Sequence, residues 1–189
     1  MKTKAIRIFL VLLVVFAFIL IECNKFPVEP TSDTSLLLDV SFEEDHTPTL
    51  EGWRFGNPQL AQLVNEAPPE GGNWSLQLTA DWAPTTGYVY RPVTNVRSGD
   101  IVKLSAYVRA KGEGGTGIIA LTIGPDHYAD NSKHSFSSDT VWNKISVIDT
   151  LELEPNDTLW VILSSPITEV IPFQQLFDLV RLEKLQNEI

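Results

Sequence analysis

The sequence has a single cysteine, Cys23, among its 189 residues. One thiol cannot form a disulfide within the chain, which excludes the small secreted domains that depend on several disulfides. The stability of the fold must therefore come from a packed apolar core, with or without a bound metal.

Basic side chains are also scarce. Lys and Arg number 14 against 24 Asp and Glu, giving a formal net charge of −10 at pH 7. Nucleic-acid binding depends on neutralising phosphates with Lys and Arg, so this composition argues against a nucleic-acid partner. Anionic membrane surfaces repel the same charge. No stretch has convincing helical periodicity, which argues against a helical domain.

The basic residues near the N-terminus form a distinct pattern. Lys2, Lys4 and Arg7 precede an uncharged apolar run over residues 8–21. The length of this run fits the h-region of a signal peptide, about 7–15 residues, better than a membrane-spanning helix of about 20. Residues 1–22 are therefore predicted to be an export signal.

The apolar run ends in Leu20-Ile21-Glu22-Cys23, which resembles the lipobox of bacterial lipoproteins. In that family the cysteine after the cut is diacylated on its sulfur, and the residue before it is normally Gly, Ala or Ser instead of Glu. The alternative is an uncleaved signal anchor. Both alternatives place the domain outside the cytoplasm, in the bacterial cell envelope.

The segment after Cys23 lacks apolar periodicity. Residues 23–35 contain Pro27 and Pro30 among polar residues and read as an extended tether. Residues 36–186 show short alternating or β-branched runs separated by Gly, Pro, Asn or Asp clusters. The expected strands are 36–42, 74–80, 88–93, 101–110, 118–123, 141–149, 158–164 and 177–184. This pattern predicts an all-β domain, a β-sandwich or jelly roll.

The clearest strand covers residues 101–110. Its apolar side chains from Val102 to Ala110 occupy alternate positions, and Tyr107 and Arg109 lie among the polar positions between them. Because strand side chains alternate between two faces, the apolar set is predicted to face the core. Tyr107 and Arg109 then face water or a ligand.

Five sequence blocks occur in the order seen in galactose-binding-domain-like jelly rolls, and the chain resembles that group from about residue 36 to 185. It is most similar to carbohydrate-binding modules of the kind that includes families 4, 9 and 22. The blocks are Val40-Ser41-Phe42-Glu43 with Gly52-Trp53, residues 73–78, residues 96–109, Trp142-Asn143-Lys144-Ile145, and residues 177–182.

The resemblance implies a structural calcium ion. In these modules it lies near the junction of the first and last strands and takes an aspartate of the last strand among its oxygen ligands. Asp178 matches that aspartate, and Glu43 is its expected neighbour. The alternative is that both carboxylates contact water or the cations Lys184 and Arg181.

Aromatic side chains are the candidates for a sugar site, because the C–H faces of sugar rings stack on flat π-systems. Trp53, Trp82, Trp160 and several tyrosines supply this surface, whereas Trp74 and Trp142 are expected in the core. The predicted ligand-binding residues are Trp82, Tyr107 and Arg109, with Gln77, Tyr88 and Trp160 as weaker candidates.

Three other motifs have ordinary explanations. The G-x-G-x-x-G string at residues 112–117 precedes a strand instead of a helix, so a β-turn is expected in place of a phosphate site. The His- and Asp-containing stretch 126–134 is expected to be a solvated loop, with a metal or acid–base site as the alternative. Glu152 and Glu154 are read as a charged strand end, although paired carboxylates serve glycosidases.

Three functions fit these observations. The favoured one is a non-catalytic, lipid-anchored protein that binds a polysaccharide or other glycan, attached to the membrane through its lipid alone. The second is a protein-interaction or scaffold module with the same fold. The third is a glycan-active enzyme.

Overall fold

A computed structural model describes residues 35–80, 87–127, 132–166 and 173–186. Cys23, the predicted export signal, residues 23–34 of the predicted tether and Trp82 lie outside these residues, while Ser35, the last tether residue, begins a strand. The described residues belong to the compact unit Asp33–Ile189. No helix among them is long and apolar enough to cross a membrane.

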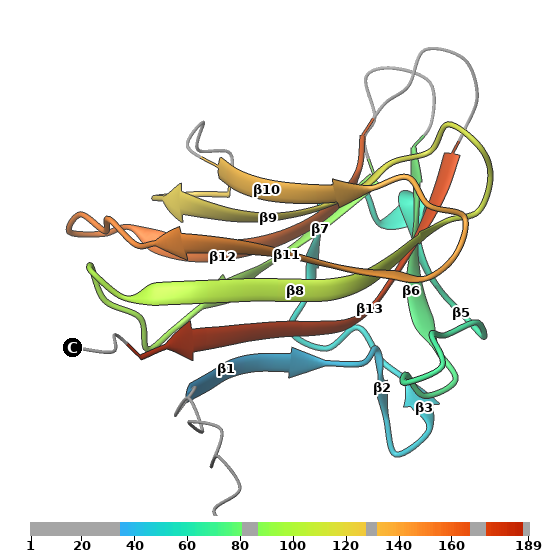
Figure 1. Cartoon of the computed structure of the whole chain (residues 1–189), viewed down its shortest axis with the longest axis horizontal. Helices are drawn as coiled ribbons and strands as arrows, with labels where there is room; N and C mark the ends of the chain where they lie inside the picture. Colours follow the sequence, from blue (N-terminus) through green and yellow to red (C-terminus); the bar gives the residue numbers. More distant parts are fainter. Residues whose placement is uncertain (1–34, 81–86, 128–131, 167–172, 187–189) are drawn as a thin grey trace, which may run out of the picture. The chain divides into compact units, whose positions relative to one another are not determined.

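Two sheets form the layers of the domain (Figure 1). The six-stranded sheet has the order β11-β8-β13-β6-β5, and β1 also pairs with β13. Its strands are β1 (Ser35–Val40), β5 (Ala61–Val64), β6 (Ser75–Ala80), β8 (Ile101–Ala110), β11 (Asn143–Thr150) and β13 (Phe173–Leu185).

The five-stranded sheet has the order β10-β9-β12-β7-β4. Its strands are β4 (Arg54–Phe55), β7 (Gly87–Val93), β9 (Gly117–Gly124), β10 (Ser132–Ser137) and β12 (Thr158–Ser165). A hairpin of β2 (Glu43–Glu44) and β3 (Thr47–Pro48) and a 3-10 turn, η1 (Pro58–Leu60), complete the described elements. The expected jelly-roll β-sandwich is confirmed.

The core lies between the inner faces of the two sheets. On β8 the inward side chains run from Val102 to Ala110 at alternate positions, all of them buried, as period two predicts. Phe177 of β13 lies opposite Val108, and Leu163 of β12 lies opposite Val89 of β7. The two sheets therefore bury complementary apolar faces.

The longest strand, β13, joins several elements (Figure 1). One edge pairs with β8, while the other pairs first with β6 and then with β1. The register shifts between Asp178 and Arg181, and Leu179 has a positive φ of 49°. This β-bulge lies where the strand changes from β6 to β1 as its partner.

Candidate ligand-binding face and cation site

Two tyrosines of β7 face away from the core. Val89 and Val93 are buried inside the sandwich, so the strand pleat turns Tyr88 and Tyr90 to the outer face of the five-stranded sheet. Trp160 of β12 lies on the same face, between two core residues of its own strand.

Four rings meet on this outer face, and we call Tyr88, Tyr90, His127 and Trp160 the aromatic cluster. His127 stacks on Tyr90 with ring centroids 3.6 Å apart and planes 8° from parallel. Tyr88 lies 6.0 Å from Tyr90, and Trp160 meets Tyr90 edge-on at 5.9 Å. The Tyr88 hydroxyl lies 3.5 Å from His127 Nε2. The arrangement combines flat apolar surface with polar ring atoms.

Backbone contacts fix two of these rings. Trp160 is 8% exposed, and its Nε1 donates a hydrogen bond to the carbonyl of Gly124 at 3.3 Å. A Cβ on Gly56 would lie 2.0 Å from a carbon of the Tyr88 ring. Glycine at position 56 therefore allows the close approach of β4 to this ring.

The electrostatics of the face centre on Arg54 and His127. Arg54 is exposed and lies opposite Tyr90 in the β4–β7 pair. Burial lowers the pKa of His127 below its usual value; the charge of Asp126 opposes this shift, and that of Arg54 adds to it. The His127 ring is therefore held mainly neutral at pH 7, next to a permanent cation.

The stretch 126–134 differs from the expected solvated loop. His127 belongs to the aromatic cluster, and residues from Ser132 onward form β10, an edge strand. Tyr88 and Tyr90 are two residues apart in the sequence, and this spacing places both side chains on the same face of a strand. The stacking of His127 and the position of Arg54 depend on strand order, which the local sequence does not encode.

The structure places the predicted ligand residues on two different sheets. Tyr88 and Trp160 belong to the aromatic cluster, whereas Tyr107 and Arg109 lie on the outer face of the six-stranded sheet. Tyr107 donates a hydrogen bond to Glu70 Oε2 at 2.6 Å, which raises the pKa of its hydroxyl. Arg109 pairs with Glu66. The β5–β6 connection therefore occupies the polar groups of both side chains.

The remaining predicted aromatic and polar candidates are also dispersed. Gln77 of β6 is only 2% exposed, and its Oε1 accepts a hydrogen bond from Lys111 at 3.3 Å. Trp53 is a core residue that packs against Phe42 with ring centroids 5.8 Å apart, so it does not supply sugar-binding surface. Trp74 and Trp142, expected in the core, are half-buried and outside the core cluster.

Glu43 and Asp178 meet beside a glycine pair. A Cβ on Gly71 would lie 2.3 Å from Asp178 Oδ2, and one on Gly72 would lie 1.5 Å from Glu43 Oε1. The backbone N–H of Asn73 donates to Glu43 Oε2 at 2.7 Å. The two carboxylates therefore pack closely against the backbone of the same glycine pair.

Asp178 is fully buried, and its Oδ2 has no hydrogen-bond partner among the described residues. Its Oδ1 accepts a hydrogen bond from the backbone N–H of Leu179 at 2.7 Å. Desolvation, partly offset by that bond, raises the pKa of Asp178 to about 7, and the charge of Glu43 adds to the rise. A buried carboxylate with an unsatisfied oxygen is costly unless a proton or a cation neutralises it.

The backbone beside both carboxylates is strained. Phe42, next to Glu43, has a φ of 54°, and Leu179, next to Asp178, has a φ of 49°. Positive φ at bulky residues costs energy and persists where the surroundings impose it, often at ligand sites. The donor set of carboxylates and backbone suits a hard cation such as calcium. The described residues hold no group of three or more His, Cys, Asp or Glu side chains for a metal.

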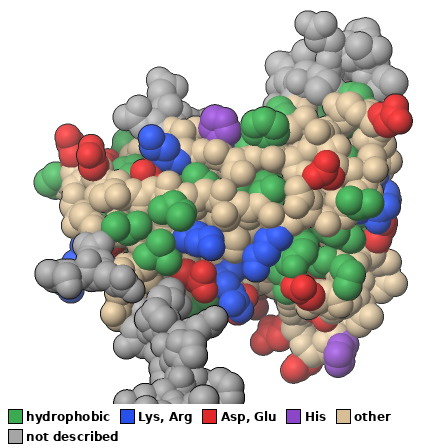
Figure 2. Space-filling view, viewed as in Figure 1, with side chains coloured by type: hydrophobic (Ala, Val, Ile, Leu, Met, Phe, Trp, Pro, Cys, Tyr) green, Lys and Arg blue, Asp and Glu red, His purple; other side chains and the backbone are tan. Residues whose placement is uncertain are grey.

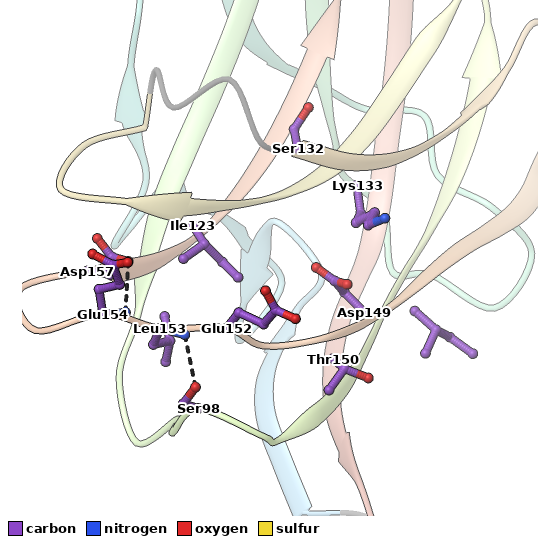
Figure 3. A pocket seen from close by; sticks show the side chains of 11 residues that line it. Ser98, Ile123, Ser132, Lys133, Asp149, Thr150, Glu152, Leu153, Glu154 and Asp157 are labelled. Atoms are coloured by element: carbon purple, nitrogen blue, oxygen red, sulfur yellow. Dashed lines mark hydrogen bonds between the residues drawn. The ribbon is translucent and has the colours of Figure 1, made fainter.

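A groove of about 970 Å3 lies at the edge of the sandwich (Figure 3). Ser132 and Lys133 of β10 border it, and the segment that follows β11 contributes Glu152 and Glu154. Both glutamates are exposed and lie beyond the end of β11 instead of on a strand, unlike the expected alternating strand end. Residues 112–115 form the expected turn between β8 and β9.

No protein-family model matches the chain, and no curated protein matches it. Several solved structures share its fold. The CBM22-1 xylan-binding domain of Xyn10C from Paenibacillus barcinonensis superposes with a TM-score of 0.58 at 20% identity, covering 80% of this chain and 96% of that one.

Two further similar structures come from other families of carbohydrate-binding modules. TmCBM61, solved in complex with β-1,4-galactotriose, has a TM-score of 0.54 at 12% identity, covering 78% of this chain and 97% of that one. A family 16 module has a TM-score of 0.58 at 16% identity, covering 78% and 99%. At these identities the likeness establishes the fold: a jelly-roll β-sandwich of the carbohydrate-binding-module type.

Proposed function

We propose that this chain is an exported, lipid-anchored protein that binds a carbohydrate through the aromatic cluster and catalyses no reaction. The observation that carries the proposal is the stack of His127 on Tyr90, beside Tyr88 and Trp160, on the outer face of a sheet. The fold shared with modules named for xylan or galactotriose binding supports the same class of ligand.

The chemistry of the aromatic cluster suits a sugar ring. The C–H groups of a pyranose pack on aromatic surface, and nearby polar atoms orient its hydroxyls. Ser164 lies opposite Tyr88 in the β12–β7 pair, and its half-buried hydroxyl adds a hydrogen-bonding group on this face. Rigid aromatic rings lose little conformational entropy when a ligand binds, so the aromatic cluster is suited to binding a ligand.

The non-catalytic part of the proposal rests on where the carboxylates lie. Glu152 and Glu154, the paired carboxylates that a glycosidase would use, line the edge groove and not the face that carries the aromatic cluster. Hydrolysis of a glycosidic bond needs two carboxyl groups flanking the bound sugar. Sugar binding and the candidate acid–base pair are therefore in different places.

We also propose that a calcium ion binds between Glu43 and Asp178. The unsatisfied Asp178 Oδ2, the close approach of both carboxylates to the Gly71–Gly72 backbone, and the oxygen donor set support such an ion. The ion would neutralise two carboxylates that otherwise repel each other. Its role is structural, because it would tie the β2 region and the β5–β6 connection to β13.

The anchor and the location are proposed from the N-terminal sequence alone. Cys23 ends a basic and apolar leader and would carry the lipid, which places the domain in the bacterial cell envelope. A glycan array probed with the detergent-solubilised full-length chain tests the ligand class. Binding to a glycan that is lost in Tyr90→Ala supports the proposal, and binding to none of the glycans contradicts it.

A protein-interaction module is the second candidate function. Phe136, Val141 and Ile148 are exposed to 63%, 70% and 56% of their surface. These side chains come from the neighbouring strands β10 and β11 and the segment between them, and a contiguous exposed apolar patch would mark a protein contact. A protein partner that binds the chain while every glycan fails would favour this role.

A further inference from the structure

Arg54 is the permanent cation next to the aromatic cluster. It is exposed on β4 and lies directly opposite Tyr90 of β7. The Cβ atoms of such antiparallel neighbours are about 4.5–5.5 Å apart, so the guanidinium starts beside the ring and can reach a ligand that lies against it. Its charge also lowers the pKa of His127, although less than burial does.

Arg54 differs from several cations on or next to the six-stranded sheet, which are paired with carboxylates of the protein. Arg109 and Lys111 pair with Glu66, and Lys184 Nζ lies 2.6 Å from Asp100 Oδ1. On the face seen in Figure 2, blue basic side chains lie next to red acidic ones. Within the described part of the chain, no carboxylate oxygen lies within 4.0 Å of the Arg54 side chain.

Other described cations, such as Arg91 and Lys144, also have no carboxylate within 4.0 Å, so what sets Arg54 apart is its place opposite Tyr90. The chain has 24 Asp and Glu for 14 Lys and Arg, so protein carboxylates are available as partners. Among the described carboxylates, Asp126, in the connection from β9 to β10, is the one whose charge acts on His127, where it opposes Arg54. The outer sheet face thus combines aromatic rings with a cation that a ligand anion can pair with.

We propose that the aromatic cluster binds a sugar residue that carries a carboxylate, as in uronic-acid-containing polysaccharides, with Arg54 as the counter-ion. This inference rests on the carbohydrate-binding function proposed above. The guanidinium forms two parallel hydrogen bonds to a carboxylate, which a neutral hydroxymethyl group cannot accept in the same way. A uronate bears this carboxylate at C5 of the ring, so one residue can pack on the aromatic cluster and also reach Arg54.

The acidic surface elsewhere does not prevent this pairing. Charges more than about 8 Å away are largely screened at physiological ionic strength, so the local field of Arg54 dominates at close range. The attraction should therefore be short-ranged and salt-dependent. A neutral sugar on the same cluster should bind with little dependence on salt.

The test compares matched oligosaccharides that differ only in charge. Glucuronoxylan and galacturonate oligosaccharides, each before and after carboxyl reduction, are titrated calorimetrically into the detergent-solubilised full-length chain. The parent should bind the anionic member of at least one pair about threefold to tenfold more tightly, the scale of a charge-assisted contact at a partly exposed site. Raising NaCl from about 20 to about 500 mM should remove most of that preference.

Two variants with the same change in net charge complete the test. Arg54→Gln should abolish the preference for the anionic member. Arg97→Gln should keep it, because Arg97 is exposed in the β7–β8 connection and is not a strand partner of Tyr90. Equal binding of both members by the parent, or binding of neutral glycans only, overturns the inference and leaves the proposed function standing. Binding to no glycan at all overturns both.

Discussion

Replacing Gly72 by alanine, which adds a single methyl group, tests the proposed calcium site. Gly72→Ala would place a Cβ 1.5 Å from Glu43 Oε1 and 2.1 Å from its Cδ. The Glu43 carboxylate must then move and lose its hydrogen bond from the Asn73 N–H, now 2.7 Å long. Because the φ of Gly72 is not positive, alanine adds no backbone strain there. The substitution therefore perturbs the proposed calcium site selectively.

The expected magnitude follows from ligand linkage. Calcium at about 100 times its dissociation constant would stabilise the parent by about 2.7 kcal/mol. For a domain of this size each kcal/mol raises the melting temperature by about 2–4 °C, so calcium should raise it by roughly 5–10 °C. Gly72→Ala should lose most of this rise. It should also lower stability in chelator by about 1.5–3 kcal/mol, because one hydrogen bond to a charged group is broken.

The assay is thermal unfolding of the detergent-solubilised chain, followed by near-UV circular dichroism in chelator and in millimolar calcium. Gly112→Ala is the matched control, since no atom lies within 4 Å of a Cβ at that position. It should respond to calcium as the parent does. A full calcium response in Gly72→Ala would refute the placement of the ion at Glu43, and no response in the parent would refute the site altogether.

Three further predictions concern other parts of the molecule. In chelator, the free energy of unfolding should fall as pH rises from about 4 to about 7, because folded Asp178 keeps its proton up to a pKa of about 7 while the unfolded chain releases it near 3.8. Asp178→Asn should reduce the dependence of the unfolding free energy on pH, measured by denaturant titrations. An unchanged pH dependence in this variant would contradict the assignment to Asp178. Tyr90→Ala should weaken glycan binding by about 1–3 kcal/mol in calorimetry, whereas Tyr107→Phe, which removes only the bond to Glu70, should leave it unchanged. Cys23→Ser should release the protein from the membrane fraction, and a variant that stays there with residues 1–22 intact would favour the signal anchor.

The sequence predicted the long strands well and the short ones poorly. β8 matches its expected bounds because ten residues of strict alternation leave no other assignment. β4, β5 and the β2–β3 hairpin are two to four residues long and carry no period that could be read. β10 was missed because its exposed, polar edge-strand sequence resembles a loop.

The alternation of apolar and polar residues predicts which face of a strand a side chain occupies, and the predicted ligand site depended on it. Period two correctly turned Tyr107 and Arg109 outwards, but it does not say which sheet a strand joins. That information lies in the strand order, and it separates Tyr107 from Tyr88. The proximity of Glu43 and Asp178 was expected from a family resemblance. In the structure both carboxylates lie against the backbone of the Gly71–Gly72 pair. The calcium ion itself stays a prediction.

The double partnership of β13 has a mechanical consequence. A force applied at the start of the domain enters through β1, whose main-chain hydrogen bonds hold it to residues 180–184 of β13. The load then reaches the bulge at Asp178, where the β6 pairing takes over. An ion bound there by Glu43 and Asp178 would connect β13, the strand that carries the force, to the rest of the sheet. The force needed to separate β1 from β13 would then depend on calcium.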